Sequence, residues 1–322
     1  MNMNMNMNQV DIVIVNWNTG ALLTNCLNSI LKSEKECIGS VIIVDNNSSD
    51  DSCPKSLNHD MVKIIHSKQN LGFGKACNLG ANYSRCPYIL FLNPDTVIEN
   101  NSIKSALDFM NLKTSINYAI CGIQLYDDQE NVSYSCSRFP TIFNKFFDIS
   151  GISKLFPSLG RPMKEFLHKK TKEVDQIMGA FFLTRRNLFI ESDGFDERFF
   201  IYYEEVDLSQ RLSLKGYKSI FFSDVKAYHL GGGSSEQVKA RRIFHSLRSE
   251  ILYFRKHANF MAFILNFSIV LLFEPIMRIL RTFLKLSFRD FFNTVYAYAM
   301  IWDWLIGTNF ITKEVSQKTF LV

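Results

Sequence analysis

Residues 199–208 set three carboxylates, those of Glu204, Glu205 and Asp207, in an aromatic and apolar segment. Carboxylates in such surroundings are costly unless they are paired or take part in chemistry. Two further groups that can bind a cation stand elsewhere: Asp95 follows an apolar run, and His229 precedes a run of glycines. Together these residues predict an acid-rich pocket that holds a cation, which favours metal-assisted group transfer.

The three carboxylates begin a predicted helix at about residues 204–215, which ends before Gly216. Acidic side chains stabilise helix N-termini, so a capping role is the alternative for at least one of them, although all three cannot be caps. Successive helix residues point about 100° apart, so Glu204 and Glu205 face different directions. We predict that Glu205 is a general base for an acceptor hydroxyl, with Glu204 and Asp207 as acceptor-binding or supporting groups.

Asp95 stands in the sequence Asn93-Pro94-Asp95, where the proline restrains the backbone and helps to aim the carboxylate at a ligand. Mg²⁺ or Mn²⁺ typically combines few protein carboxylates with substrate phosphates. His229 is expected as a further ligand, since a neutral imidazole binds metals and the glycines at 231–233 let backbone approach a phosphate. A turn-forming Asp95 and a structural His229 remain alternatives.

The N-terminal part predicts an α/β fold with a mostly parallel sheet, because expected strands alternate with expected helices. The strands are residues 10–15, 41–44, 62–66 and 88–92, and the helices are residues 22–31, 74–83 and 102–110. Parallel sheets bind ligands where their strands end. Asp45 follows such a strand and is expected to accept hydrogen bonds from a nucleobase or ribose, with a turn-forming role as the alternative.

Other segments are less informative. Residues 70–78 contain Gly72-Phe73-Gly74 but no full dinucleotide fingerprint and no phosphate-binding P-loop, so either assignment is weak. Residues 134–172 are interpreted as aromatic and basic loops that form an acceptor-side lid. After these loops, a regular pattern of secondary structure is again expected at residues 176–184, and residues 224–228 are expected as a last strand.

The composition excludes a disordered chain, since 47% of the 322 residues are hydrophobic and 21% are charged. The net charge of +5 belongs to the C-terminal quarter, where residues 239–322 hold twelve Lys/Arg and five Asp/Glu. This asymmetry favours anionic lipid headgroups or a phosphorylated acceptor over nucleic acid. Seven cysteines without a Cys-x-x-Cys pair suit a reducing cytosol, and residues 1–9 are expected to be a disordered leader.

The C-terminal region predicts membrane-surface helices. Residues 239–257 form an expected basic helix, and the sixteen uncharged residues 258–273 fall short of the roughly 20 that a spanning helix needs. Arg278, Arg281, Lys285 and Arg289 then recur at helical spacing between apolar residues, as in a helix that lies in the bilayer interface. The alternative is a helix that packs on the catalytic domain and turns a solvated basic edge outward.

In this order and spacing the motifs resemble family 2 glycosyltransferases of the GT-A fold, and they are most similar to the rhamnosyltransferase-like branch. The resemblance covers roughly residues 10–233. The segments that carry it are residues 14–18, 44–50, 70–74 with Asn78, 92–95, 178–186, 194–197, 204–208 and His229.

The resemblance implies a GT-A catalytic domain at residues 10–235, a Rossmann-like mixed sheet flanked by helices, and a basic amphipathic helical extension at 236–322. It implies that Asp95 and His229, with Asn93, hold Mg²⁺ or Mn²⁺, and that residue 205 is the base. The family usually has Asp at 205 and often Asp-x-Asp at 93–95, which leaves Glu204 as an alternative base and makes Asn93 a weaker ligand. The implied donor-binding residues are Asn16, Asn18, Asp45, Asn47, Gly72, Phe73, Asn78, Asn93, Asp95, Gly179 and Ala180.

The implied activity is inverting, metal-dependent transfer of one sugar, rhamnose by similarity, from a nucleotide-diphosphate donor to a glycan or lipid-diphosphate-linked acceptor in surface polysaccharide synthesis, such as O-antigen. No tryptophan follows an arginine, so the Gln-x-x-Arg-Trp motif of processive synthases is absent from the sequence. The enzyme is expected in the cytoplasm, peripheral at the inner face of the membrane, without nucleic acid; a homodimer is left open. The rival interpretation is a non-catalytic nucleotide-sugar-binding or scaffold protein of polysaccharide assembly.

Overall fold

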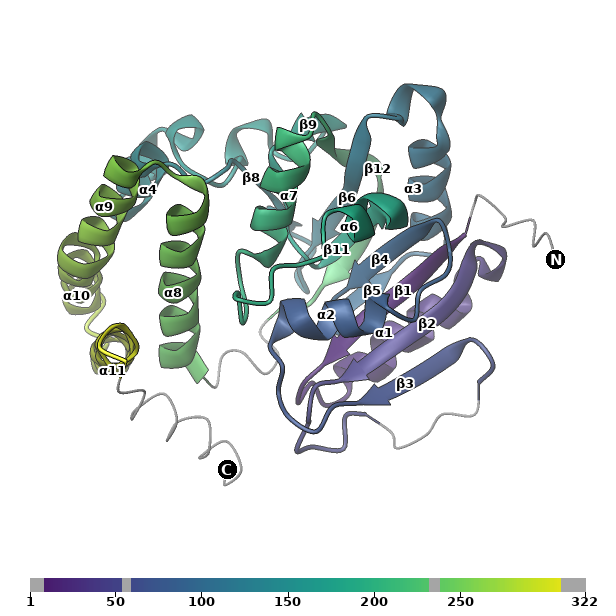
Figure 1. Cartoon of the computed structure of the whole chain (residues 1–322), viewed down its shortest axis with the longest axis horizontal. Coiled ribbons are helices and arrows are strands. Elements are labelled where there is room, and N and C mark those ends of the chain that lie inside the picture. Colours follow the sequence, from purple (N-terminus) through teal and green to yellow (C-terminus); the bar gives the residue numbers. More distant parts are fainter. Residues whose placement is uncertain (1–8, 54–58, 232–237, 308–322) are drawn as a thin grey trace. The chain divides into compact units, whose positions relative to one another are not determined.

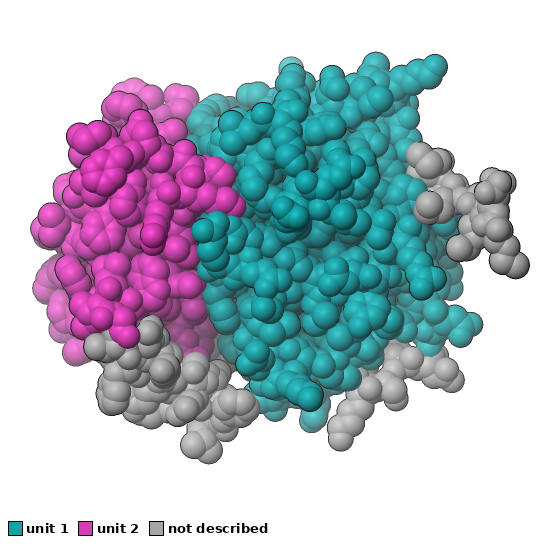
Figure 2. All heavy atoms as spheres, in the orientation of Figure 1, with its two compact units in different colours: residues 1–139, 161–200, 204–233 teal, residues 140–160, 201–203, 234–322 magenta. Residues whose placement is uncertain are grey.

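A computed structural model describes residues 9–53, 59–231 and 238–307 (Figure 1). The chain forms two compact units, coloured teal and magenta in Figure 2. Unit 1 comprises residues 1–139, 161–200 and 204–233, and unit 2 comprises residues 140–160, 201–203 and 234–322. The predicted domain boundary at 235/236 lies outside the described residues, as does the predicted leader apart from Gln9.

Within the described residues, unit 1 is built on a ten-stranded sheet with the order β3-β2-β1-β4-β11-β6-β12-β5, while β7 pairs with β6 and β9 with β12. Two short strands form a separate sheet, β8 (Cys136–Ser137) and β10 (Gln176–Ile177). The strands of the large sheet are β1 (Val10–Asn16), β2 (Ile38–Asp45), β3 (Val62–His66), β4 (Tyr88–Leu92), β5 (Thr96–Ile98), β6 (Tyr118–Tyr126), β7 (Val132–Ser133), β9 (Lys172–Val174), β11 (Phe181–Arg185) and β12 (Lys218–His229).

The N-terminal half of the sheet is parallel: β1 pairs with β2 and β4, and β2 pairs with β3. β11 is antiparallel to both β4 and β6, whereas β6 and β12 are parallel. This mixed sheet with flanking helices confirms the predicted α/β class. The parallel strands β1, β2 and β4 end at one edge, where Asn16, Asp45 and Asn93 follow or close them.

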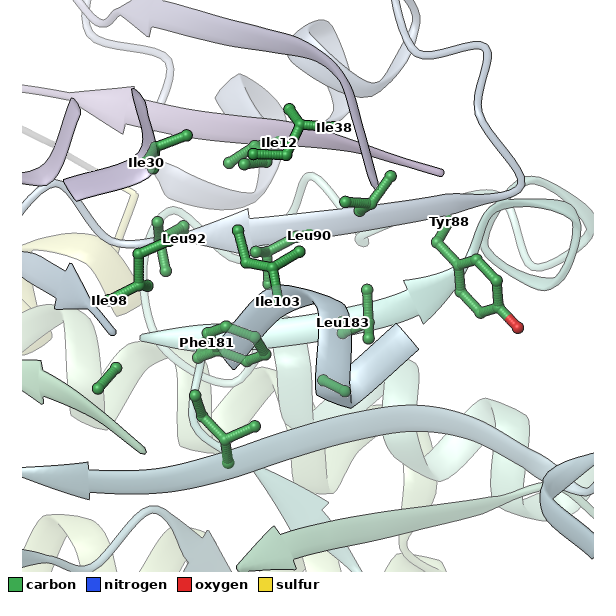
Figure 3. Close-up of a cluster of buried hydrophobic side chains, with 14 of the residues drawn as sticks. Ile12, Ile30, Ile38, Tyr88, Leu90, Leu92, Ile98, Ile103, Phe181 and Leu183 are labelled. Carbon is green, nitrogen blue, oxygen red and sulfur yellow. The ribbon is translucent and has the colours of Figure 1, made fainter. Parts of the chain in front are cut away.

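Helices cover both faces of the sheet, which explains why its strands are apolar runs rather than alternating patterns. Ile12 and Ile14 belong to the core layer under α1 (Leu22–Lys32) and α3 (Ser102–Asn111). Figure 3 shows side chains of this layer, among them Ile12, Leu90, Ile103 and Leu183. Val13 and Val15 belong to the opposite layer, with α2 (Phe73–Ala81), α6 (Arg186–Glu191) and α7 (Glu204–Leu214).

Two expectations for the elements were wrong or incomplete. Residues 134–172 are not only loops, because they contain helices α4 (Ile142–Ser150) and α5 (Ile152–Leu155). The start of α4 is fixed by a capping box: Thr141 Oγ1 accepts from the Asn144 N–H at 3.2 Å, and Asn144 Oδ1 accepts from the Thr141 N–H at 2.9 Å. Strand β6, buried through most of its length, had no predicted counterpart.

Unit 2 is helical in its described residues. Its core contains Phe244, Leu247, Ile251, Val270 and Ile301, each at most 6% exposed. The expected basic helix at 239–257 is present as α8. Besides α4, α5 and the short 3₁₀ turn η3 (Pro157–Leu159), the described helices of unit 2 are α8 (Lys239–His257), α9 (Phe260–Ser268), the π-helical turn η6 (Ile269–Phe273), α10 (Glu274–Leu284) and α11 (Phe288–Leu305).

Candidate active site

The end of β12 meets the segment that follows β4. β5 runs antiparallel to β12 with Thr96 opposite His229, which sets the preceding residue Asp95 beside the histidine. Asp95 Oδ1 lies 3.2 Å from His229 Nε2, and Asn93 Nδ2 lies 3.4 Å from the same nitrogen. The Leu230 N–H donates to the Asp95 carbonyl at 3.0 Å and fixes the junction. The structure therefore brings together the three residues predicted to bind a metal.

The donor set fits a divalent cation that takes most of its ligands from a substrate. Asp95 Oδ1 is buried and, within residues 9–53, 59–231 and 238–307, accepts no hydrogen bond. Across the same residues no cluster of three or more His, Cys, Asp or Glu could hold a metal by itself. One carboxylate and one imidazole are few ligands, which is the pattern of Mg²⁺ or Mn²⁺ sites that are completed by phosphate oxygens.

Asn16 and Asp45, at the ends of β1 and β2, anchor a polar network. Asn16 Nδ2 lies within hydrogen-bonding distance of Asp45 Oδ1 at 3.3 Å, Ser48 Oγ at 3.0 Å and Ser52 Oγ at 2.9 Å. The other Asp45 oxygen lies 3.2 Å from Nδ1 of His66. Asp45 Oδ1 also accepts from the Ser48 N–H at 3.4 Å, so the protein orients this carboxylate through both of its oxygens.

The loops beyond these strands interlock. Asn18 Oδ1 accepts from the Ser49 N–H at 2.7 Å, and the Asn18 N–H donates to Ser48 Oγ at 3.1 Å. Asn18 and Asn47 have left-handed backbone, with φ of 51° and 64°, which asparagine tolerates better than most residues. Both predicted donor-binding asparagines therefore lie in the turns at the carboxyl edge of the sheet.

Gly72 and Phe73 form a tight junction at the start of α2. Gly72 has φ of 82°, and a Cβ there would lie 2.3 Å from the Phe200 carbonyl oxygen, so only glycine fits. The Phe73 N–H donates to that oxygen at 2.6 Å, and the Gly72 carbonyl accepts from Asn46 Nδ2 at 3.2 Å. This junction joins the β2 loop to the segment ahead of the acidic helix.

Asn78 links helix α2 to the segment around Phe195. Its Nδ2 donates to the Phe195 carbonyl at 2.8 Å, and its Oδ1 accepts from the Phe195 N–H at 2.9 Å. Because the Asn78 amide both donates to and accepts from the backbone of Phe195, it joins α2 to the loop after α6. The described contacts of Asn78 are structural, and its predicted contact with the donor stays a prediction.

A line of contacts leads from Asn93 to the acidic helix. The Asn93 N–H donates to the Ala180 carbonyl at 3.2 Å. The neighbouring Gly179 faces the ring of Phe73: a Cβ added to this glycine would lie 3.6 Å from Phe73 Cε1. Gly74, the residue after Phe73 in α2, packs against Glu204: a Cβ added to Gly74 would lie 3.3 Å from the Cβ of Glu204. Every residue in this line belongs to unit 1.

The three carboxylates of α7 have three different environments. Glu204 is 3% exposed and packs on α2, and the charges of Glu204 and Glu205 add to the burial that raises the pKa of the Cys77 thiol. Asp207 is fully buried and accepts from Arg211 Nε at 2.8 Å. Arg211 in turn donates to the carbonyls of Ser192 and Gly194. Asp207 therefore holds the loop before α7, which is a supporting role.

Glu205 has a perturbed proton affinity. Burial raises its pKa above the ordinary 4.5, while backbone N–H groups at the start of α7 and the guanidinium of Arg161 oppose that rise. Glu205 Oε2 is buried and has no hydrogen-bond partner among the described residues. Arg161 was not predicted as a site residue, because only tertiary folding brings it near Glu205.

The model of the family described as glycosyl transferase family 2 matches residues 11–192, more than half of the chain. The chain belongs to glycosyltransferase family 2. It is similar to the rhamnosyltransferase WbbL of Escherichia coli K12, with 28% identity over 192 residues, 56% of this chain and 69% of the relative. It is also similar to the N-acetylglucosaminyl-diphospho-decaprenol L-rhamnosyltransferase of Mycobacterium tuberculosis, with 26% identity over 68% of this chain and 75% of the relative. The protein is a glycosyltransferase of glycan synthesis.

Solved structures agree on the fold. The mannosyltransferase PcManGT of Pyrobaculum calidifontis, solved with GDP-Man and Mn²⁺, aligns over 92% of this glycosyltransferase and 87% of its own chain, with a TM-score of 0.56 and 14% identity. GalNAc-T7, solved with UDP, GalNAc and Mn²⁺, aligns over 70% of this chain and 44% of its own, with a TM-score of 0.54 and 15% identity. At these identities the likeness concerns the GT-A fold alone.

Proposed function

We propose that this glycosyltransferase is inverting, metal-dependent and non-processive, and that it moves one sugar from a nucleotide-diphosphate donor to a hydroxyl of a glycan or lipid-linked glycan. The observation that carries the proposal is the line of contacts with the Asp95–His229 pair near one end and the Glu204–Glu205 pair at the other. A carboxylate at one end of this line and a metal-binding pair near the other would supply the two functions that glycosyl transfer needs, a base and a partner for the leaving diphosphate.

Donor binding is assigned to the carboxyl edge of the sheet. Asp45, held by Asn16 and His66, is the proposed partner of the nucleotide's base or ribose. Asn18, Asn47 and the Gly72–Phe73 junction line the adjoining turns. Rhamnose is the proposed sugar, because both relatives named above are rhamnosyltransferases.

Asp95 and His229, with Asn93 beside them, would hold Mg²⁺ or Mn²⁺, as the unused lone pairs of Asp95 Oδ1 suggest. When bound, the cation neutralises the charge that develops on the departing nucleotide diphosphate. Both structural relatives named above were solved with Mn²⁺. The protein's own contribution is to hold the carboxylate and the imidazole together before any donor arrives.

Glu205 is the proposed base. Its carboxylate takes the proton of the acceptor hydroxyl while that oxygen bonds to the anomeric carbon and the carbon–oxygen bond to the diphosphate breaks. The electron pair leaves with the nucleoside diphosphate, and attack from the opposite face inverts the anomeric centre. The raised pKa of Glu205 makes it a stronger base than an ordinary carboxylate.

The acceptor is proposed to be a diphosphate-linked lipid or its glycan, handled at the cytoplasmic face of the membrane. The mycobacterial relative is named for such an acceptor, N-acetylglucosaminyl-diphospho-decaprenol. The positive charge of residues 239–322 suits a diphosphate headgroup.

Replacement of the base tests the reaction. Glu205→Gln keeps the shape of the side chain but removes its proton affinity, so transfer should fall by about two to four orders of magnitude. Donor binding in the presence of Mn²⁺, measured by calorimetry, should stay within about threefold of the parent. Glu204→Gln is the matched control and should retain most transfer. If Glu204→Gln abolishes transfer while Glu205→Gln retains it, the base is Glu204.

A further inference from the structure

Unit 2 presents one apolar stripe along consecutive helices. The segment Phe260–Leu284 is the one described helix that is long and apolar enough to cross a membrane by length and composition, yet only 17% of its most apolar window is buried. Most of its large exposed side chains stand three, four or seven residues apart and thus share one helix face. The stripe consists of Leu265, Leu272, Ile276, Leu280, Phe283 and Leu284, which are 50–84% exposed.

The charged side chains of the same segment make contacts on its inner side. Lys145 of α4 lies 2.7 Å from Glu274 and 2.6 Å from Glu250 of α8. Arg278 lies 2.6 Å from Glu274, and Arg281 donates to the carbonyls that end α4. Burial alone would lower the pKa of Lys145, but the carboxylates of Glu250 and Glu274 raise it, so the network stays ionised. This network fastens α10 to α4 and leaves its outer face without polar groups.

The four basic residues that were expected on one face, Arg278, Arg281, Lys285 and Arg289, do not all point outward. Arg278 and Arg281 face inward, whereas Lys285 and Arg289 are exposed at the turn between α10 and α11. They alternate there with Leu284, Leu286 and Phe288, which are 84%, 87% and 80% exposed. Over the described part of α8–α11 each carboxylate is buried, apart from Asp290, which pairs with Lys239 at 2.5 Å. The exposed charge beside the stripe is therefore positive.

We propose that this stripe and the α10–α11 turn form a docking face that lies in the interfacial layer of an anionic lipid bilayer. Leucine and phenylalanine side chains would enter the acyl boundary, and Lys285 and Arg289 would reach the anionic headgroups. The alternation of large apolar and cationic residues at one exposed turn matches the two layers of such an interface.

A spanning helix fits less well. If Phe260–Leu284 crossed the bilayer, Glu274, Arg278 and Arg281 would enter hydrocarbon and the Lys145 pairs would be broken, at a large cost in free energy. A second copy of the chain fits less well too, because a two-fold contact near the turn would oppose Lys285 and Arg289 to their own equivalents. The proposal adds a membrane surface to the proposed function, and the vesicle-binding measurement that tests it contains no sugar substrate.

The test is co-sedimentation of the full chain with vesicles of phosphatidylcholine containing about 30% phosphatidylglycerol, and with phosphatidylcholine alone. We expect binding to the anionic vesicles, and at least about tenfold weaker binding for Leu284→Glu/Leu286→Glu. Lys285→Glu/Arg289→Glu should lose the preference for anionic lipid. The matched control is Leu214→Glu/Ile116→Glu, which charges two residues of unit 1 that are 74% and 68% exposed and should bind like the parent.

Circular dichroism and transfer to a short soluble acceptor verify that each variant is folded. The proposal is overturned if the parent does not sediment with anionic vesicles, or if Leu284→Glu/Leu286→Glu binds them as well as the control does. It is also overturned if light scattering shows a dimer that this variant converts to a monomer, because the face would then join two copies. Loss of sugar transfer with intact vesicle binding would count against the proposed reaction alone.

Discussion

Asp95 Oδ1 and His229 Nε2 lie 3.2 Å apart, but the oxygen accepts no hydrogen bond from the described residues. The two side chains, each 16% exposed, are thus held together by the strands that carry them and not by a directional bond between them. The carboxylate oxygen keeps its lone pairs available for a further partner, whereas His229 Nε2 also faces Asn93 Nδ2 at 3.4 Å. The pair is therefore organised for a ligand before that ligand binds.

The first prediction concerns metal affinity. Asp95→Asn replaces an anionic oxygen by a neutral amide, and His229→Gln removes the imidazole, so each should weaken Mn²⁺ binding in the presence of a nucleoside diphosphate by about tenfold or more. Titration calorimetry measures the effect without any sugar transfer. Lys218→Gln alters an exposed ion pair with Glu173 instead and should leave Mn²⁺ affinity nearly unchanged. Equal affinities of the parent and Asp95→Asn would remove Asp95 from the metal site.

The second prediction concerns pH. The base must be ionised to accept a proton, so transfer should fall as the pH drops through the pKa of Glu205, which burial raises above 4.5. Arg161 opposes that rise, and Arg161→Gln should therefore raise the pKa further and move the acid limb of kcat/KM to higher pH. Arg161→Lys retains the charge and should leave the limb close to that of the parent. A limb that moves to lower pH in Arg161→Gln would contradict the assignment of Glu205.

The third prediction separates two neighbouring carboxylates by stability. Asp207→Asn breaks the buried pair with Arg211 and should lower the free energy of unfolding by about 3 kcal/mol. Glu205→Gln removes a charge whose Oε2 has no described partner, so it should leave stability unchanged or raise it slightly. Urea unfolding followed by circular dichroism compares the two. The reverse order of stabilities would mean that Glu205 is the structural residue and Asp207 the functional one.

The parts of the fold that the sequence predicted are those with strong local patterns. β3 and β4 were predicted with their observed bounds, and α8 likewise, because periodicity and flanking polar residues mark them. Strand β6 was not predicted, in part because Gly122 interrupts its apolar run, and glycine is unfavourable within a strand. The structure gives the reason for this glycine: a Cβ there would lie 2.3 Å from Ile177 Cγ2.

The residues of the candidate site likewise include some that a local sequence pattern predicts and others that it does not. Asp95 and His229 could be predicted because each stands at the end of a strand pattern, and parallel strands gather their ends at one edge. The position of Asn78 could not, because its partner Phe195 is distant in the chain and a motif does not state which way an amide points. Arg161 and the inward turn of Arg278 likewise depend on tertiary packing, which leaves no periodic signal.

The last prediction concerns Gly72, where two costs can be separated. Its φ of 82° disfavours any side chain, and an added Cβ would also lie 2.3 Å from the Phe200 carbonyl oxygen. Gly216 has a φ of 89° with nothing within 4 Å of an added Cβ, so Gly216→Ala carries the backbone cost alone, about 1 kcal/mol. Gly72→Ala should lower the free energy of unfolding by at least about 2 kcal/mol more than this control in urea titrations. It should also weaken donor binding, because relief of the clash displaces the Phe73 N–H from the Phe200 carbonyl and the Gly72 carbonyl from Asn46. Equal stability losses in the two variants would show that the Gly72 junction yields easily, and donor binding would then not depend on its close packing.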